Sequence, residues 1–132
     1  MQLNNVQLVG RLTKDPELKN TTLGKALVEA SLAINESYTD SDGQKHDITT
    51  FCDFQTWGKS AEALAKRAQK GEQLFVSGPL RQSNWKDQET GKDRSKLFVK
   101  ADSWQFVQYK ATEARREAAK AVEVESDEEK WH

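Results

Sequence analysis

Two aromatic side chains on one face of a predicted strand carry the clearest chemical potential in this sequence. Residues 48–57 alternate as a strand does. One parity holds natural core residues such as Ile48 and Phe54. The other parity places Phe51 and Trp57 between polar neighbours. Large aromatics on a solvent face expose apolar area that folding would otherwise bury. Stacking on nucleic-acid bases uses such faces and contributes roughly 1–3 kcal/mol per base. Packing of this face in a dimer or beneath a loop is the structural alternative.

Trp85 and Tyr38 extend the set of candidate stacking residues. Trp85 sits at the mouth of a polar hairpin loop, where there is little core for it to join. Tyr38 follows the second predicted strand, beside the turn at Asp42-Gly43, and shares the parity of Ile34. Strict alternation would bury Tyr38, so a twist or a bulge is needed to turn it outward. The predicted stacking residues are Tyr38, Phe51, Trp57 and Trp85.

Basic side chains near these aromatics are candidates for neutralising phosphates. The predicted phosphate-binding residues are Arg11, Lys14, Lys59, Arg81 and Lys86. For any single lysine, an ordinary solvated surface position is the alternative. The net charge of -1 hides an asymmetry, because residues 1–112 are weakly basic and residues 113–132 are acidic. This distribution mildly favours a polyanion as a partner.

The elements that must position these side chains are mostly strands. The apolar patterns predict strands at residues 6–12, 26–34, 48–57, 73–77, 80–85 and 96–109, and a helix at residues 61–70 with Ser60 as its N-cap. Strand and helix do not alternate, which argues against parallel βαβ units. The pattern favours an all-β fold, a five-stranded Greek-key barrel of the OB-fold type with one short helix between strands 3 and 4. A two-sheet sandwich is the second candidate. Gly10 inside the first strand predicts a bulge or a close backbone approach.

Length and composition allow one domain and a tail. The 132 residues are 36% hydrophobic and 31% charged, which suffices for one modest core. We assign an OB-fold domain to residues 1–110 and a helix-prone or disordered acidic tail to residues 111–132. One cysteine and two histidines leave almost nothing from which to build a disulfide framework, a metal centre or a Ser-His-Asp triad. The composition therefore argues against a metal site and against triad-based catalysis.

The sequence also carries no signal for a membrane or for secretion. No run approaches the roughly 18 apolar residues of a membrane span. The first residues lack the basic and apolar regions of a secretory signal. We expect a cytoplasmic protein with no membrane partner.

Several motifs resemble those of the bacterial single-stranded-DNA-binding protein family, and the resemblance spans about residues 3–109. The matching segments are VQLVGRLTKDPE at 6–17, LAINESY at 32–38, TTFCDFQTWGK at 49–59, GPLR at 78–81 and WKD at 85–87. The family places stacking aromatics at the positions of Tyr38, Phe51, Trp57 and Trp85. All four positions are aromatic here.

The resemblance implies an OB-fold protein that wraps single-stranded DNA without sequence preference in replication, recombination and repair. It implies a homotetramer (a dimer in some members) that is not an enzyme and needs no cofactor, with a nucleoid-associated location. An acidic tail recruits replication or repair proteins in the family, but the end of this chain, residues 127–132, does not match the family's Pro-Phe tip. Five positions that are often basic in the family are not basic here: Thr39, Ser41, Asp53, Ser83 and Asn84.

Two other functions compete with this interpretation. One is an OB-fold protein-interaction subunit, similar to a primosome accessory protein, with weak nucleic-acid affinity. The loss of basic residues favours it, and the intact aromatic set argues against it. The other is an enzyme acting on nucleic acid, for which the sequence offers neither a ligand cluster nor a nucleophile paired with a base.

Overall fold

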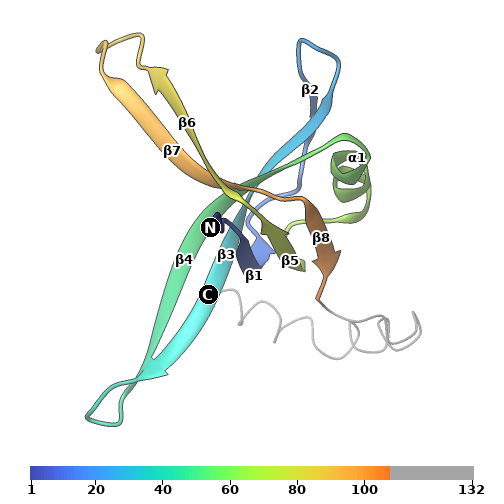
Figure 1. Ribbon diagram of the computed structural model, residues 1–132. Helices are drawn as coiled ribbons and strands as arrows, with labels where there is room; N and C mark the ends of the chain where they lie inside the picture. The colour runs from blue at the N-terminus through green and yellow to red at the C-terminus, as the bar shows by residue number, and fades with distance from the viewer. Residues whose placement is uncertain (108–132) are drawn as a thin grey trace, which may run out of the picture.

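Eight strands and one helix make up the part of the chain that the computed structural model describes, residues 1–107 (Figure 1). The elements are β1 (Val6–Leu12), β2 (Leu18–Asn20), β3 (Ala26–Thr39), β4 (Lys45–Trp57), α1 (Gly58–Arg67), β5 (Gln73–Gly78), β6 (Leu80–Lys86), β7 (Asp93–Lys100) and β8 (Ser103–Phe106). The prediction of a mainly β fold, with a helix after the third long strand, is confirmed. The predicted tail, residues 111–132, lies outside the described residues. Within residues 1–107, no helix has the length and apolarity needed to cross a membrane.

Alternating burial on neighbouring strands builds one core. Leu74 and Val76 of β5 are fully buried, whereas the residues between and beside them are partly exposed. Helix α1 adds Ala61 and Leu64 to the same cluster. The largest fully buried side chains are Phe54, Leu12, Leu32, Leu64, Leu74, Val28, Val76, Val99 and Thr56. Each large apolar side chain contributes about 1.5–3 kcal/mol by leaving water, which makes this cluster the main source of stability.

The strands form one strongly bent sheet that does not close by hydrogen bonds. Its order is β6-β7-β4-β3-β1-β5-β8, with β2 beside β3, and the β4–β7 pair is parallel. The six predicted strands become eight because the last one, 96–109, is interrupted at residues 101–102 and because short β2 is added. Pro79 makes the other interruption, between β5 and β6, as the sequence predicts. Pro79 has no N–H for a ladder. Its carbonyl oxygen still accepts a hydrogen bond from the Lys100 N–H at 2.9 Å, so the two interruptions lie together. This arrangement is the partly open barrel of an OB-fold.

Gly10 lies where β1 passes close to β3. A Cβ atom at this position would lie 2.9 Å from the Ala33 carbonyl oxygen and 3.1 Å from the Leu32 Cβ atom. The prediction of a close backbone approach is confirmed. The absence of a side chain lets β1 pair with β3 along one edge and with β5 along the other.

Helix α1 begins and ends before its predicted bounds, since local side chains take other partners. Ser60 is not the N-cap, because it lies in the first turn, where its hydroxyl accepts a hydrogen bond from the Thr56 hydroxyl at 2.9 Å. Beyond the other end, the Lys70 N–H donates to the Asp15 carboxylate at 2.7 Å. The Lys70 N–H is thus satisfied by a side chain rather than by a helical carbonyl oxygen, and the helix ends before this residue.

Two hairpin arms project from the body, one formed by β3 and β4 and the other by β6 and β7 (Figure 1). Inside the body, β4 and β7 lie side by side through the pairs Phe54–Val99 and Gln55–Lys100. Toward its turn, the β3–β4 arm leaves the body, so solvent reaches both of its faces. Ile48, predicted as a core residue, is therefore 48% exposed. The face bounded by these arms carries three of the four predicted stacking residues, as the registers of the strands show.

Candidate nucleic-acid interface

The register of β3 and β4 places Phe51 and Trp57 on one face. Residues directly opposite each other in the ladder are Ala33–Phe51, Ser31–Asp53, Glu29–Gln55 and Leu27–Trp57. Side chains two residues apart on a strand point the same way, about 7 Å apart along the strand. Phe51, Asp53, Gln55 and Trp57 therefore form one row. Phe54 points to the opposite side and is 1% exposed in the core, as the alternation predicted.

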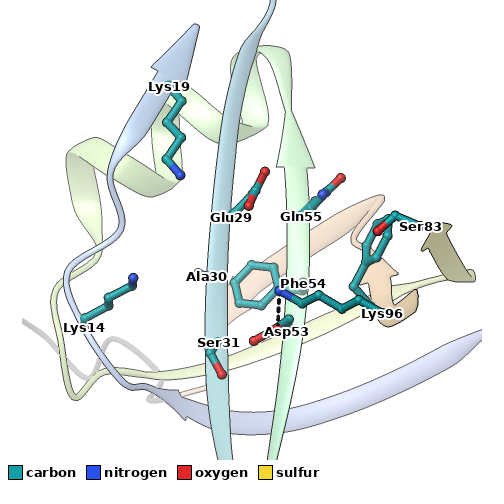
Figure 2. Close-up of a pocket in the computed structure, with 11 residues that line it drawn as sticks. Lys14, Lys19, Glu29, Ala30, Ser31, Asp53, Phe54, Gln55, Ser83 and Lys96 are labelled. Carbon is teal, nitrogen blue, oxygen red and sulfur yellow. Dashed lines mark ion pairs between the residues drawn. The ribbon is translucent and has the colours of Figure 1, made fainter. Parts of the chain in front are cut away.

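The β6–β7 arm adds a second row beside the first. Ser83 pairs with Lys96 and Trp85 with Arg94 across this ladder, so all four belong to one face of the arm. Ser83 and Lys96 line a hollow of about 260 Å³ together with Asp53 and Gln55 of β4. We call this hollow the central groove. Its complete lining is Lys14, Lys19, Glu29, Ala30, Ser31, Asp53, Phe54, Gln55, Ser83, Lys96 and Phe98 (Figure 2).

Three of the four predicted stacking residues border the central groove. Phe51 and Trp57 each lie one step beyond its lining residues on β4, and Trp85 lies one step beyond Ser83 on β6. Phe51 is 67% exposed and Trp85 48% exposed, whereas Trp57 is half-buried. Flat apolar rings thus surround a polar, lysine-containing hollow. This arrangement would suit a single-stranded nucleic acid whose bases stack on the rings and whose sugar-phosphate backbone passes over the lysines.

The register separates Tyr38 from the other three aromatics. Tyr38 pairs with His46, so both side chains lie on the face of the β3–β4 arm opposite to Phe51. Their rings stack with centroids 5.1 Å apart and planes at 21°. Tyr38 keeps the parity of Ile34 and is nevertheless 49% exposed, because the arm has already left the body. The twist or bulge that the sequence required is not needed.

The turn beyond Tyr38 is organised by Asp40. Its carboxylate lies 2.7 Å from His46 Nε2 and accepts hydrogen bonds from the N–H groups of Asp42 and Gln44, both at 2.9 Å. The bond to His46, ahead of the bond from Gln44, lowers the pKa of Asp40 below its ordinary value of 3.8. These bonds hold the tip of the arm and position the Tyr38–His46 stack.

We expect replacement of His46 to raise the pKa of Asp40. His46→Phe keeps a ring beneath Tyr38 but removes the strongest of the hydrogen bonds that stabilise the carboxylate. The titration midpoint of Asp40, followed by carboxyl carbon NMR, should move up toward 3.8. The pKa of Asp40 is lower in the folded protein than in the unfolded chain. The ionised carboxylate therefore stabilises the turn at pH values above the unfolded-state pKa, and this stabilisation is lost as the pH falls through the folded-state pKa. An unchanged midpoint would show that the His46 bond does not form in solution.

The predicted phosphate-binding residues differ in their surroundings. Lys14 lines the central groove, Lys59 is exposed in the first turn of α1, and Arg81 and Lys86 are exposed on β6. Arg11 donates from Nη1 to the Gly71 carbonyl oxygen at 3.0 Å, so its guanidinium also holds the turn after α1. Only Lys14 of the five is therefore part of the groove lining.

Two lysines of the central groove were missed from the sequence. Lys19 reaches the groove from β2, and a strand of three residues is too short to show alternation. Lys96 reaches it from β7 and forms an ion pair with Asp53, with Nζ and Oδ2 2.7 Å apart. Counting outward from Thr90-Gly91 as a two-residue turn would have placed Lys96 on the correct face but opposite Trp85, two residues from its observed partner Ser83. Its pairing with Asp53 joins distant strands and leaves no local signal.

Comparisons with known proteins agree on one family. The sequence profile of the single-strand binding protein family matches residues 3–107. The single-stranded DNA-binding protein of Treponema pallidum is 40% identical over 105 residues, which is 80% of this chain and 58% of that protein. Single-stranded DNA-binding protein A of Bacillus subtilis is 39% identical over 108 residues, 82% of this chain and 61% of that protein.

Among solved structures, a deletion variant of the single-stranded DNA binding protein from Thermus aquaticus is similar to this chain. The TM-score is 0.71 at 29% identity, over 82% of this chain and 52% of that one. This chain therefore spans about three fifths of the Treponema and Bacillus relatives and about half of the Thermus chain. The similarity supports the OB-fold assignment made from the strand order.

Proposed function

Because the chain belongs to the single-strand binding protein family, we propose that it binds single-stranded DNA without sequence preference. The observation that carries the proposal is the set of rings around the central groove, with Phe51 and Trp85 about half exposed or more. Every base has a π-face, so stacking on such rings tolerates any sequence. We propose Tyr38, Phe51, Trp57 and Trp85 as the stacking residues, with Tyr38 acting on the outer face of its arm.

The basic residues supply the second half of the proposed mechanism. Lys14 lies in the groove, and Arg81 shares the groove-side parity of Ser83 on β6. Lys59 follows Trp57 by two residues and Lys86 follows Trp85 directly, and both lysines are exposed. Each phosphate that they neutralise releases counterions, so binding should weaken with salt. Arg11 is included in the proposal, although its guanidinium also holds Gly71.

In this role the protein would shield single-stranded DNA during replication, recombination and repair, in the cytoplasm and at the nucleoid. We propose a binding protein rather than an enzyme, working without a cofactor. The acidic segment beyond residue 110 would be its contact for replication or repair proteins.

We expect self-association, most simply as a tetramer. Apolar side chains remain exposed on several strands, among them Val9 (41%), Ile48 (48%) and Leu97 (59%), and contact between copies would bury such area. Closed symmetry is the usual outcome for small subunits. Light scattering at micromolar concentration should give about four times the mass of one chain. A mass equal to one chain would contradict the expectation and favour a monomeric OB module.

Titration of the intrinsic tryptophan fluorescence with poly(dT) tests the proposed function. Stacking of bases on Trp57 and Trp85 should quench the emission, and the quench should reverse when salt is raised. Duplex DNA of equal nucleotide concentration is the matched control and should quench far less, because its bases are not free to stack. No quenching and no binding by poly(dT) would overturn the proposal and favour the protein-interaction subunit.

A further inference from the structure

An ion pair occupies the middle of the central groove. Lys96 Nζ on β7 lies 2.7 Å from Asp53 Oδ2 on β4, and Figure 2 shows the lysine reaching across to the carboxylate. The two side chains are 49% and 38% exposed, so a ligand can reach both. The hydrogen bond with Asp53, ahead of the nearby negative charges, raises the pKa of Lys96. The ammonium group is therefore charged at neutral pH and already has an anionic partner.

The position of this pair matters for a ligand that lies along β4. Asp53 is in the same row as Phe51 and Trp57, between the two rings. A backbone that connects bases stacked on those rings must pass close to the Lys96 ammonium. A carboxylate oxygen at 2.7 Å makes the same charge-assisted contact with an ammonium that a phosphate oxygen makes. Asp53 thus fills the place of a phosphate in the free protein.

The groove's other lysines are not held in this way. Within residues 1–107, the structure gives ion pairs to Lys96, Arg94 and His46, and to neither Lys14 nor Lys19. Exposed ion pairs contribute little to folding stability, so exchanging one partner for another costs the fold little. The Lys96–Asp53 pair can open without disturbing the core beneath it.

We propose that Asp53 is an internal competitor that DNA phosphate must displace from Lys96. The inference rests on the proposed function and refines it, because it names the residue that limits the affinity of the central groove. In the wild-type protein, Lys96 therefore adds less to the affinity for DNA than an unpaired lysine at the same position would add.

A double-mutant cycle tests this competition. Wild type, Asp53→Asn, Lys96→Met and the double variant are titrated with a fluorescent oligo(dT) at several salt concentrations. Asp53→Asn should tighten binding on the order of fivefold to tenfold near 0.05 M salt and steepen the salt slope by about 0.7, the value for one phosphate. Lys96→Met alone should weaken binding by less than threefold. In the Lys96→Met background, Asp53→Asn should raise the affinity for oligo(dT) by no more than about twofold.

The controls separate competition from a general effect of charge. Asp47→Asn removes a carboxylate from the same face of β4, six residues away and without an ion pair, and should change affinity less than twofold. Thermal melts confirm that each variant is folded. An equal gain from Asp53→Asn with and without Lys96, or an equal gain from Asp47→Asn, would overturn the proposal. If wild type binds oligo(dT) but Asp53→Asn does not tighten it, this inference fails and the proposed function stands. If wild type does not bind, both fail.

Discussion

Removing two rings from the groove border should strongly weaken the binding of single-stranded DNA. Phe51 and Trp85 are 67% and 48% exposed and border the central groove from different strands. A stacked base is worth roughly 1–3 kcal/mol, so Phe51→Ala with Trp85→Ala should weaken binding roughly 30-fold or more. Each single variant should show part of that loss. Anisotropy of a labelled oligo(dT) at fixed salt measures all three.

The matched control is another exposed apolar side chain outside the groove. Leu23, at the turn between β2 and β3, is 83% exposed, and Leu23→Ala should leave DNA affinity unchanged. Melting temperatures of all variants should stay close to that of wild type, since none of these side chains is buried. Wild-type affinity in the double variant would rule out the groove border as the stacking surface.

Replacing Phe54 should have the largest effect on folding. Phe54 is 1% exposed in the core cluster, and truncation of a buried phenylalanine leaves a cavity. We expect Phe54→Ala to lower the free energy of unfolding by about 3–5 kcal/mol. Phe51→Ala, three residues earlier on the same strand, should lower it by well under 1 kcal/mol, as exposed substitutions usually do. Urea unfolding at one protein concentration compares them.

Comparing these two phenylalanine variants tests which face of β4 is exposed to solvent. Phe51→Ala should lose DNA affinity and keep stability, whereas Phe54→Ala should lose stability first. Equal destabilisation by both variants would mean that β4 does not present Phe51 to solvent. The concentration is held fixed because self-association would add to the apparent stability.

The face assignments of β4 follow from sequence because they depend on a local rule. Residues alternate in and out along a strand, and the polar neighbours of Phe51 and Trp57 identify their face. A second local rule predicted the close backbone approach at Gly10, since a glycine within a strand often marks such a contact. The single helix was predictable for a similar local reason, although competing side-chain bonds at Ser60 and Lys70 shifted its ends.

What could not be predicted depends on contacts between distant segments. Alternation does not say how far a hairpin extends beyond the body, so Ile48 was assigned to the core and Tyr38 to a bulge. Three residues of β2 carry no pattern, and Lys19 was missed with them. The Lys96–Asp53 pair joins residues on strands that neighbour each other only through the parallel β4–β7 contact. Of these features, Lys19 and the Lys96–Asp53 pair determine the charge of the central groove.

Photo-crosslinking with an oligo(dT) that carries 5-iododeoxyuridine shows directly which aromatic rings contact bound DNA. The bound DNA is irradiated, and the attached residues are identified by mass spectrometry. Crosslinks should fall on Phe51, Trp57 and Trp85 around the central groove. Trp104 is an internal control, because its indole N–H donates to the Ser60 carbonyl oxygen at 3.1 Å, away from the groove lining. Crosslinks at Trp104 with none on the three groove rings would contradict the account.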